Sequence, residues 1–421
     1  MQDLYTLEKI LRENDLINDR VSLKSRYAKA IKDPVVRKIF DLKTPEITDL
    51  SPMLEIEGKG KVYAVRYDLN RGVDNHKKHV VAGLILRGVL QGKIPREEID
   101  TFIDGGNFNS AKAVKFYADR FKLRGMYVMS RLFPKEIIAI LESDNFNVIK
   151  APRKYDHARE REFYEYLFEC MKDREFRKDK FCLWHAKYGG EVSYPFGKEI
   201  AEKLDIHPTH LVSCLGAGTT LQGLQIAIQD YFKERKVKEV PRIVVAEHER
   251  SPLFTKIIKH VTLARKRNGL EESIKEEAYQ RKYGIPHLVL GPHYDEINPL
   301  LSRDSINKID EVVLYSETEW KQIQKELLRK DLSIGNSSAA NVSVAKRLAN
   351  EGNNVLTVIF EPYRDFYQQL EADISSNQDI PWLFRYETPA QKIAFIATSV
   401  VWFSGAVCCA LSDNQFPIIP F

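Results

Sequence analysis

The run KKHVVAGLILRGVLQGKIPREEIDTFIDGGN, residues 77–107, decides how this chain is interpreted. It begins with a lysine at the start of an apolar helix pattern and passes through a glycine–proline turn at residues 92–95. It ends in Asp104-Gly105-Gly106-Asn107, after a short apolar run at 100–103. We therefore expect a helix, a strand and a tight turn that opens a second helix over 110–121. An amine at a helix start and a turn of backbone donors can together hold an aldehyde cofactor.

A glycine-rich loop lies downstream of this run. An apolar strand at 210–213 leads into Gly216-Ala217-Gly218-Thr219-Thr220, and a helix pattern begins at Leu221. Glycines let backbone N–H groups converge, the helix start adds the positive end of a dipole, and the threonines add hydroxyl donors. These features favour a bound phosphate, with a purely geometric role for the glycines as the alternative. The loop lacks both the lysine of a nucleotide P-loop and the later acidic residue of a dinucleotide site.

Strands and amphipathic helices alternate along most of the chain. Further strands are predicted at 61–67, 126–129, 146–150, 243–247, 311–313 and 355–360, and further helices at 134–141, 317–328 and 339–349. This alternation predicts an α/β protein of two lobes, each a mostly parallel sheet flanked by helices. We divide the chain into a helical extension (1–45), a first lobe (46–190), a second lobe (191–375) and an apolar helical tail (376–421). The charged stretch 151–185 is interpreted as a helical crossing between the lobes.

Composition excludes several classes of protein. The 421 residues are 43% hydrophobic and 29% charged, which is typical of a globular protein. A net charge of +5 over so long a chain does not indicate nucleic-acid binding. The five cysteines form no disulfide pattern and no Cys-x-x-Cys pair, so we expect no metal and a reducing, cytoplasmic location.

The uncharged segment from Ile393 to Leu411 complicates that location. Its length is at the lower limit for a membrane-spanning helix. The favoured interpretation is a buried helix or a helix in a subunit interface, and a membrane anchor is the alternative.

The order of these motifs resembles that of the fold type II pyridoxal-phosphate enzymes, the family of cysteine synthase, cystathionine β-synthase and the tryptophan synthase β chain. The matching segments are Ser51-Pro52-Met53, the strand at 61–67, Asn70-x-Gly72, Lys77, Gly105-Gly106-Asn107 and the loop 216–220. Residues 244–247 and 335–340 also resemble family segments. The resemblance covers roughly residues 50–370.

The resemblance implies a role for each matching residue. Lys77 would be the Schiff-base lysine, with Lys78 as the second choice. Gly216, Ala217, Gly218, Thr219 and Thr220 would bind the phosphate of pyridoxal 5'-phosphate, and Asn107 would bind its ring hydroxyl. Tyr363 lies nearest to the family serine that faces the pyridine nitrogen, and Glu361 is the alternative at that position. The family also implies an amino-acid substrate and a homodimer.

The substrate turn departs from the family pattern. The family reads Thr-Ser-Gly-Asn-Thr, whereas this chain reads Asp104-Gly105-Gly106-Asn107-Phe108, so hydroxyl donors are lost and a carboxylate is gained. A carboxylate repels the carboxylate of an amino acid unless it is paired or protonated. Asp104 is therefore either a structural turn cap or an acid or base that assists the leaving group. His293 is a further candidate, which either faces the substrate or caps its loop.

These observations favour a lyase or transferase that depends on pyridoxal phosphate. It would catalyse β-elimination or β-replacement on a serine- or cysteine-type amino acid, as cysteine synthase does. A dehydratase or racemase that uses the same cofactor is one alternative. A non-catalytic partner subunit that retains the fold is another, and the altered substrate turn favours it.

Overall fold

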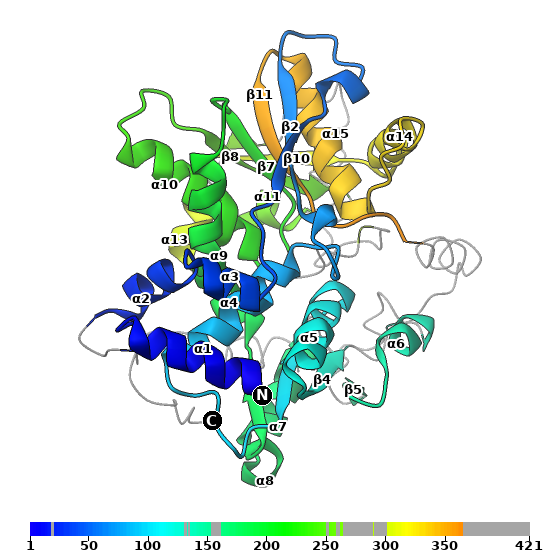
Figure 1. Cartoon of the computed structure of the whole chain (residues 1–421). Helices are drawn as coiled ribbons and strands as arrows, with labels where there is room; N and C mark the ends of the chain where they lie inside the picture. The colour runs from blue at the N-terminus through cyan, green and yellow to red at the C-terminus, as the bar shows by residue number, and fades with distance from the viewer. Residues whose placement is uncertain are drawn as a thin grey trace.

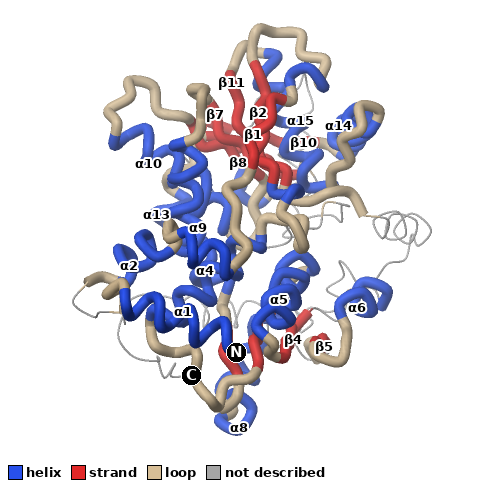
Figure 2. Tube along the Cα trace, in the orientation of Figure 1, coloured by secondary structure: helices blue, strands red, loops and turns tan. Residues whose placement is uncertain are grey.

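The computed structural model describes residues 1–17, 21–129, 133, 135–152, 161–249, 252–257, 262–263, 289 and 301–364. Within these ranges the chain forms two mainly parallel sheets flanked by helices, the larger one uppermost in Figures 1 and 2. The two-lobed α/β architecture predicted from the alternation of strands and helices is confirmed.

The larger sheet has the strand order β1-β2-β11-β7-β8-β10-β9. Only β1, at one edge, runs antiparallel to its neighbour; the other described pairs are parallel. The strands are β1 Glu46–Asp49, β2 Lys61–Arg66, β7 His210–Ser213, β8 Arg242–His248, β9 Thr262–Leu263, β10 Glu311–Tyr315 and β11 Asn354–Ile359.

The smaller sheet has the order β5-β4-β3-β6, and its pairs are all parallel. Its strands are β3 Thr101–Gly105, β4 Arg124–Met129, β5 Phe146–Lys150 and β6 Lys180–Cys182. Parallel strands bring their carboxyl ends to one edge of the sheet, which is where open α/β sheets bind ligands.

Helices cover both sheets (Figure 1). They are α1 Gln2–Glu13, α2 Leu23–Ala30, α3 Pro34–Ile39, α4 Lys77–Leu90, α5 Phe108–Phe121, α6 Lys135–Leu141, α7 Arg161–Lys172, α8 Arg174–Arg177, α9 His185–Glu202, α10 Ile226–Glu234, α11 Leu253–Ile257, α13 Arg303–Ile306, α14 Glu317–Leu328 and α15 Asn336–Asn350. None of the helices in the described ranges is both long and apolar enough to span a membrane. The segment 393–411 lies outside those ranges.

The N-terminal helices belong to the core of the smaller lobe. Leu4, Leu7 and Leu11 recur at helical spacing on α1 and are buried in the same hydrophobic cluster as the apolar residues of α4 and α5. Residues 1–45 contain the helices α1, α2 and α3, of which α1 and α2 pack against α4.

The structure corrects the sequence-based division of the lobes. We assigned residues 46–190 to the first lobe, but β1 and β2 lie in the larger sheet, because β2 pairs in parallel with β11. That pairing joins distant parts of the chain, so the local pattern of apolar residues could not predict it. The boundary at residue 190 also falls inside α9.

Helix α9 was missed because it contains residues that disfavour helices. Gly189 and Gly190 lie in its second turn and Pro195 lies in its middle. Tertiary packing outweighs these preferences, since one part of α9 packs against α4 and another against α10 and the π-helical turn at Leu221–Gln225 (Figure 1). Strand β6, just before α9, was also missed within the charged stretch that we interpreted as a crossing.

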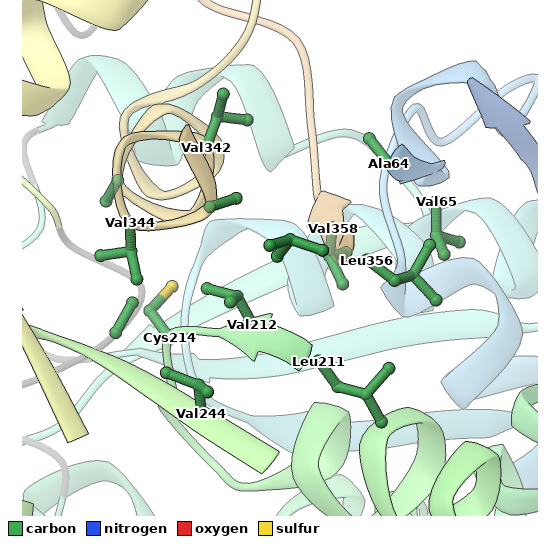
Figure 3. Close-up of a cluster of buried hydrophobic side chains, with 14 of the residues drawn as sticks. Ala64, Val65, Leu211, Val212, Cys214, Val244, Val342, Val344, Leu356 and Val358 are labelled. Atoms are coloured by element: carbon green, nitrogen blue, oxygen red, sulfur yellow. The ribbon is translucent and has the colours of Figure 1, made fainter. Parts of the chain in front are cut away.

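The core of the larger lobe fixes the chain that precedes the glycine-rich loop. Figure 3 shows side chains of α15, β7, β8 and β11 meeting in this core, among them Val212, Val244 and Val358. Asn341 of α15 is fully buried beside them. Its Oδ1 accepts a hydrogen bond from the backbone N–H of Cys214 (2.7 Å), and its Nδ2 donates to the carbonyl of Val358 (2.9 Å).

Replacing Asn341 by leucine is expected to lower the free energy of unfolding by about 2–4 kcal/mol, because two buried backbone groups lose a partner. Chemical denaturation followed by circular dichroism measures this change. The matched control is Ser343→Ala on the same helix, whose hydroxyl bonds only to the Ala340 carbonyl. The control should change the free energy by less than about 0.5 kcal/mol. Equal losses in the two variants would contradict the bridging role.

Candidate functional site

Lys77 lies where the two lobes meet. It is the first residue of α4 and is 5% exposed. Its Nζ donates a hydrogen bond to Oγ1 of Thr219, in the glycine-rich loop of the larger lobe, at 3.3 Å. The sequence predicted these two motifs separately, and the fold brings them into contact.

Lys78 faces a different part of the molecule. Its Nζ contacts Oδ2 of Asp41 at 2.8 Å and the carbonyl of Arg71 at 2.7 Å. Burial lowers the pKa of Lys78, and the hydrogen bond that Lys78 donates to Asp41 opposes that effect. Successive helix residues point about 100° apart, so only one of two adjacent lysines can face the loop. The geometry therefore favours Lys77 over Lys78 as the amine of the site.

The loop at 216–220 follows β7 and leads into a helical segment. Gly218 has a φ of +79°, and a Cβ at this position would lie 2.5 Å from Leu301 Cδ1, so only glycine fits. Thr219 is buried, while Gly216, Ala217 and Thr220 are half-buried. Backbone N–H groups at such a helix start have no partner within the helix and can bind an anion.

The turn at 104–108 connects β3 to α5. Gly106 has a φ of +149°, and a Cβ there would lie 2.8 Å from the Tyr127 hydroxyl. Asn107 precedes the first residue of α5, and its Oδ1 accepts from the Ser110 hydroxyl at 3.2 Å. Gly105 is buried, and its backbone N–H donates to Oδ1 of Asp104 at 2.9 Å.

Asp104 is fully buried and its carboxylate is engaged by the protein. Its Oδ2 accepts from the backbone N–H of His185 at 3.2 Å and lies 3.1 Å from Nδ1 of the same histidine. Two donors on one side and Gly105 on the other compensate the charge. The repulsion expected between Asp104 and a substrate carboxylate is therefore reduced.

The turn is also linked to the start of α4. Asn75 is fully buried; its Oδ1 accepts from the backbone N–H of Lys77 at 2.8 Å, and its Nδ2 donates to the carbonyl of Asn109 at 3.3 Å. One amide thus holds Lys77 beside the first turn of α5. Asn75 belongs to the segment that precedes the predicted lysine, but its sequence context gave no sign of this role.

Phe108 is the buried first residue of α5, and the guanidinium of Arg364 lies 5.5 Å from the centre of its ring. Arg364 Nε is also 3.6 Å from Oε2 of Glu361, which is 3% exposed at the end of β11. Tyr363, between them in sequence, is half-buried. The positive charge of Arg364 therefore lies close to the altered substrate turn.

Two histidines near the site were missed by sequence reasoning, and one predicted residue is not described. His185 was missed because β6 was missed, and His76 directly precedes Lys77. Burial lowers the pKa of His76 well below its usual value, and the charge of Lys77 adds to this effect. His293 lies outside the described residues.

Glu247 ends a segment that resembles the family pattern and is buried at the end of β8. Its carboxylate accepts from the backbone N–H groups of Phe254 (2.6 Å) and Thr255 (3.1 Å) and from the Thr255 hydroxyl (2.7 Å). Burial raises the pKa of Glu247 from 4.5 to about 7, because these hydrogen bonds only partly offset the loss of water.

Comparison with known proteins places this geometry in a family. The model of a family described as "Pyridoxal-phosphate dependent enzyme" matches residues 46–361. No curated protein matches the chain.

Solved structures share the fold at low sequence identity. An O-acetylserine-dependent cystathionine β-synthase from Helicobacter pylori is 20% identical, with a TM-score of 0.58 over 77% of this chain and 94% of that one. A hydrogen sulfide-producing enzyme from Fusobacterium nucleatum is 14% identical, with a TM-score of 0.59 over 78% and 97%. An O-ureido-L-serine synthase is 15% identical, with a TM-score of 0.57 over 86% and 98%. At these identities the likeness shows the fold, that of the fold type II pyridoxal-phosphate enzymes.

The residues at the site fit pyridoxal phosphate. The loop 216–220 offers backbone and hydroxyl donors suited to a phosphate, and its Thr219 already contacts an amine. That amine, Lys77, is buried and suited to bond an aldehyde.

The buried Glu247 predicts a dependence of stability on pH. Between pH 4.5 and 7 the folded protein retains a proton that the unfolded chain has released, so the free energy of unfolding falls as the pH rises. The total contribution is about 3 kcal/mol. Glu247→Gln, whose amide oxygen can still accept, should remove it. Denaturation at a series of pH values measures the difference between parent and variant.

Glu317→Gln is the control for that measurement. Burial raises the pKa of Glu317, but the hydrogen bond from His248 and the charges of His248 and Lys321 together outweigh burial and lower the net pKa. The contribution of Glu317 to stability therefore changes with pH only below pH 4.5. Using the difference from the parent also removes the effect of buried histidines such as His79, whose pKa burial lowers to about 4. A parent-minus-Glu247→Gln difference that is constant from pH 4.5 to 7 would contradict the prediction.

Proposed function

This chain belongs to the family of pyridoxal-phosphate-dependent enzymes, and we propose that it is a lyase or transferase acting by β-elimination or β-replacement on a serine- or cysteine-type amino acid. The observation that carries the proposal is the contact of the buried Lys77 amine with Thr219, at 3.3 Å, in the loop suited to phosphate. The structural likeness to enzymes named for O-acetylserine and O-ureido-L-serine supports the substrate class.

When bound, pyridoxal phosphate supplies a ring that stores the electron pair left on the substrate α-carbon. Lys77 would have two tasks: its amine would hold the cofactor through the aldehyde, and the same amine, once free, would remove the substrate α-proton as general base. Its burial excludes water from that amine. Thr219 and the backbone of its loop would hold the phosphate, and Asn107 would bind the ring hydroxyl.

The substrate carboxylate would bind beside the first turn of α5. Helix N-termini attract anions, and the guanidinium of Arg364, which also pairs with Glu361, lies close to Phe108. Because Asp104 is compensated by His185 and Gly105, its charge does not prevent this binding. These contacts would replace the hydroxyl donors of the family turn.

A dehydratase or racemase that uses the same cofactor is the second candidate. The observation that favours it is the burial of Glu361, whose Cγ lies 2.8 Å from the position of a Cβ on Gly335. A carboxylate facing the pyridine nitrogen would keep that nitrogen protonated and make the ring a stronger electron acceptor, whereas the Tyr363 hydroxyl would not. A homodimer and a cytoplasmic location remain further proposals from the sequence.

Variants of the adjacent lysines test the role of Lys77. The parent protein should absorb near ~420 nm and be bleached by borohydride, because it contains an imine. Lys77→Ala should lose this band. Lys78→Met should keep the band but lose about 1–3 kcal/mol of unfolding free energy, because Asp41 and the Arg71 carbonyl lose a charged partner. The reverse pattern would transfer the role to Lys78.

A substrate panel tests the reaction. We expect O-acetylserine or cysteine to lose its β-substituent, with serine, phosphoserine and threonine as comparisons, and Lys77→Ala to slow the reaction by about 10²–10⁴-fold. Keto-acid formation and α-deuterium exchange are measured in parallel. Exchange or inversion at the α-carbon without loss of the β-substituent would favour the racemase. No change in any of these amino acids would reject both candidates and favour the non-catalytic subunit.

A further inference from the structure

A chain of three buried polar side chains lies behind the substrate turn. Asp104 Oδ2 is 3.1 Å from Nδ1 of His185, and Nε2 of His185 is 3.2 Å from the hydroxyl of Tyr164. These side chains come from β3, α9 and α7, and all three residues are buried. We propose that Asp104, His185 and Tyr164 form a proton relay that serves the leaving group. This inference rests on the proposed β-elimination or β-replacement.

The fold brings these residues together through parallel strands. β3 and β6 are neighbours, with Ile103 opposite Cys182. Their carboxyl ends therefore lie side by side; Asp104 is the last residue but one of β3, and the chain continues from β6 to His185. This edge of a parallel sheet is the usual place for ligand binding.

Asp104 fixes which nitrogen of His185 can exchange a proton. Its Oδ1 is held by Gly105 N–H, and its Oδ2 accepts from the His185 backbone at 3.2 Å. A carboxylate can only accept, so Nδ1 carries a hydrogen that points at Oδ2. Nε2 is then the exchanging nitrogen, and it faces Tyr164.

The relay contacts both motifs of the candidate site. A Cβ on Gly106 would lie 2.9 Å from Cε1 of His185, so the imidazole is packed against the turn. One helical turn after His185, a Cβ on Gly189 would lie 2.5 Å from Cγ2 of Thr219, the partner of Lys77. Residues four apart share a helix face, so His185 and Gly189 line the same side of α9.

The titratable groups around the relay keep fixed protonation states near neutral pH. Burial, and then the charge of Asp104, raise the pKa of Tyr127 on β4 and of Cys182 on β6 well above their usual values. Burial and the charge of Lys77 keep the pKa of His76, at the start of α4, well below its usual value. These three described groups therefore keep one protonation state near neutral pH.

The relay would pass one proton from His185 through Tyr164 to the leaving group. The leaving group departs with the electron pair of its bond to the β-carbon and takes the proton of the Tyr164 hydroxyl. Tyr164 takes the Nε2 proton of a doubly protonated His185, which becomes neutral and keeps its Nδ1 hydrogen on Asp104. In a replacement, the incoming nucleophile returns its own proton to the relay. Asp104 and His185 are positioning residues in this scheme, since they act through Tyr164.

Leaving groups of different basicity test the relay. Hydroxide leaving from serine needs a proton, whereas acetate leaving from O-acetylserine does not. We expect His185→Gln, Asp104→Asn and Tyr164→Phe to lower kcat on serine by about 10²–10⁴-fold and on O-acetylserine by less than about 10-fold. A purely structural role would slow both substrates equally, and that result would overturn the proposal. His248→Gln breaks a part-buried histidine–carboxylate pair of the larger lobe, between His248 on β8 and Glu317 on α14 at 3.1 Å, and should show no such discrimination.

A measurement that does not use turnover separates this proposal from the proposed function. In protein labelled with ¹⁵N-histidine, NMR should show a hydrogen on Nδ1 of His185 that Asp104→Asn shifts. The ~420 nm band should persist in all three variants, because Lys77 is unchanged. If the parent acts on neither substrate, the proposed function fails, and the NMR result alone judges the pairing. A His185 Nδ1 without a hydrogen would overturn the relay.

Discussion

The contact between the Lys77 amine and the Thr219 hydroxyl is the constraint on which the rest of the structure depends. An amine taken out of water requires a partner, and this partner belongs to the other lobe. The two lobes must therefore be held in a fixed relation. Helix α9 holds them, since it packs on α4 with one part and on the segment after the glycine-rich loop with another. On the smaller lobe, the buried amide of Asn75 holds the backbone of Lys77 beside the start of α5.

The positions of two adjacent lysines on a helix give their identical side chains different partners. Lys77 and Lys78 are both buried, yet the rotation of about 100° between successive residues sends one amine to Thr219 and the other to Asp41. The second contact ties α4 to the segment that follows the N-terminal helices. Those helices therefore complete the hydrophobic core of the smaller lobe and support the helix that carries Lys77.

The charges around the altered substrate turn explain how it can carry a carboxylate at Asp104. In the sequence, Asp104 looks opposed to an anionic substrate. In the structure its carboxylate is directed to His185 and to Gly105 N–H, and the positive charge near the turn comes from Arg364 over the Phe108 ring. Burying a carboxylate beside an imidazole costs free energy, and we propose that this pair of Asp104 and His185 forms the relay together with Tyr164.

The sequence alone determined the features that depend on neighbouring residues: the strands, the helices and the glycine-rich loop. Alternating apolar periods gave the strands at 146–150 and 210–213 and the helix at 317–328 at the bounds that the structure has, and the two-lobed α/β fold with them. The glycines and threonines of the loop 216–220 indicated a phosphate site, and the order of the motifs identified Lys77 as the candidate amine.

Contacts between segments far apart in the chain were decided only by the tertiary structure. The pairing of β2 with β11 moved residues 46–66 to the other sheet, and packing on both sides made a helix of α9 despite Gly189 and Pro195. Asn75, His185 and Tyr164 gained their positions from neighbours far along the chain, and such long-range contacts leave no periodic signal in the sequence around them.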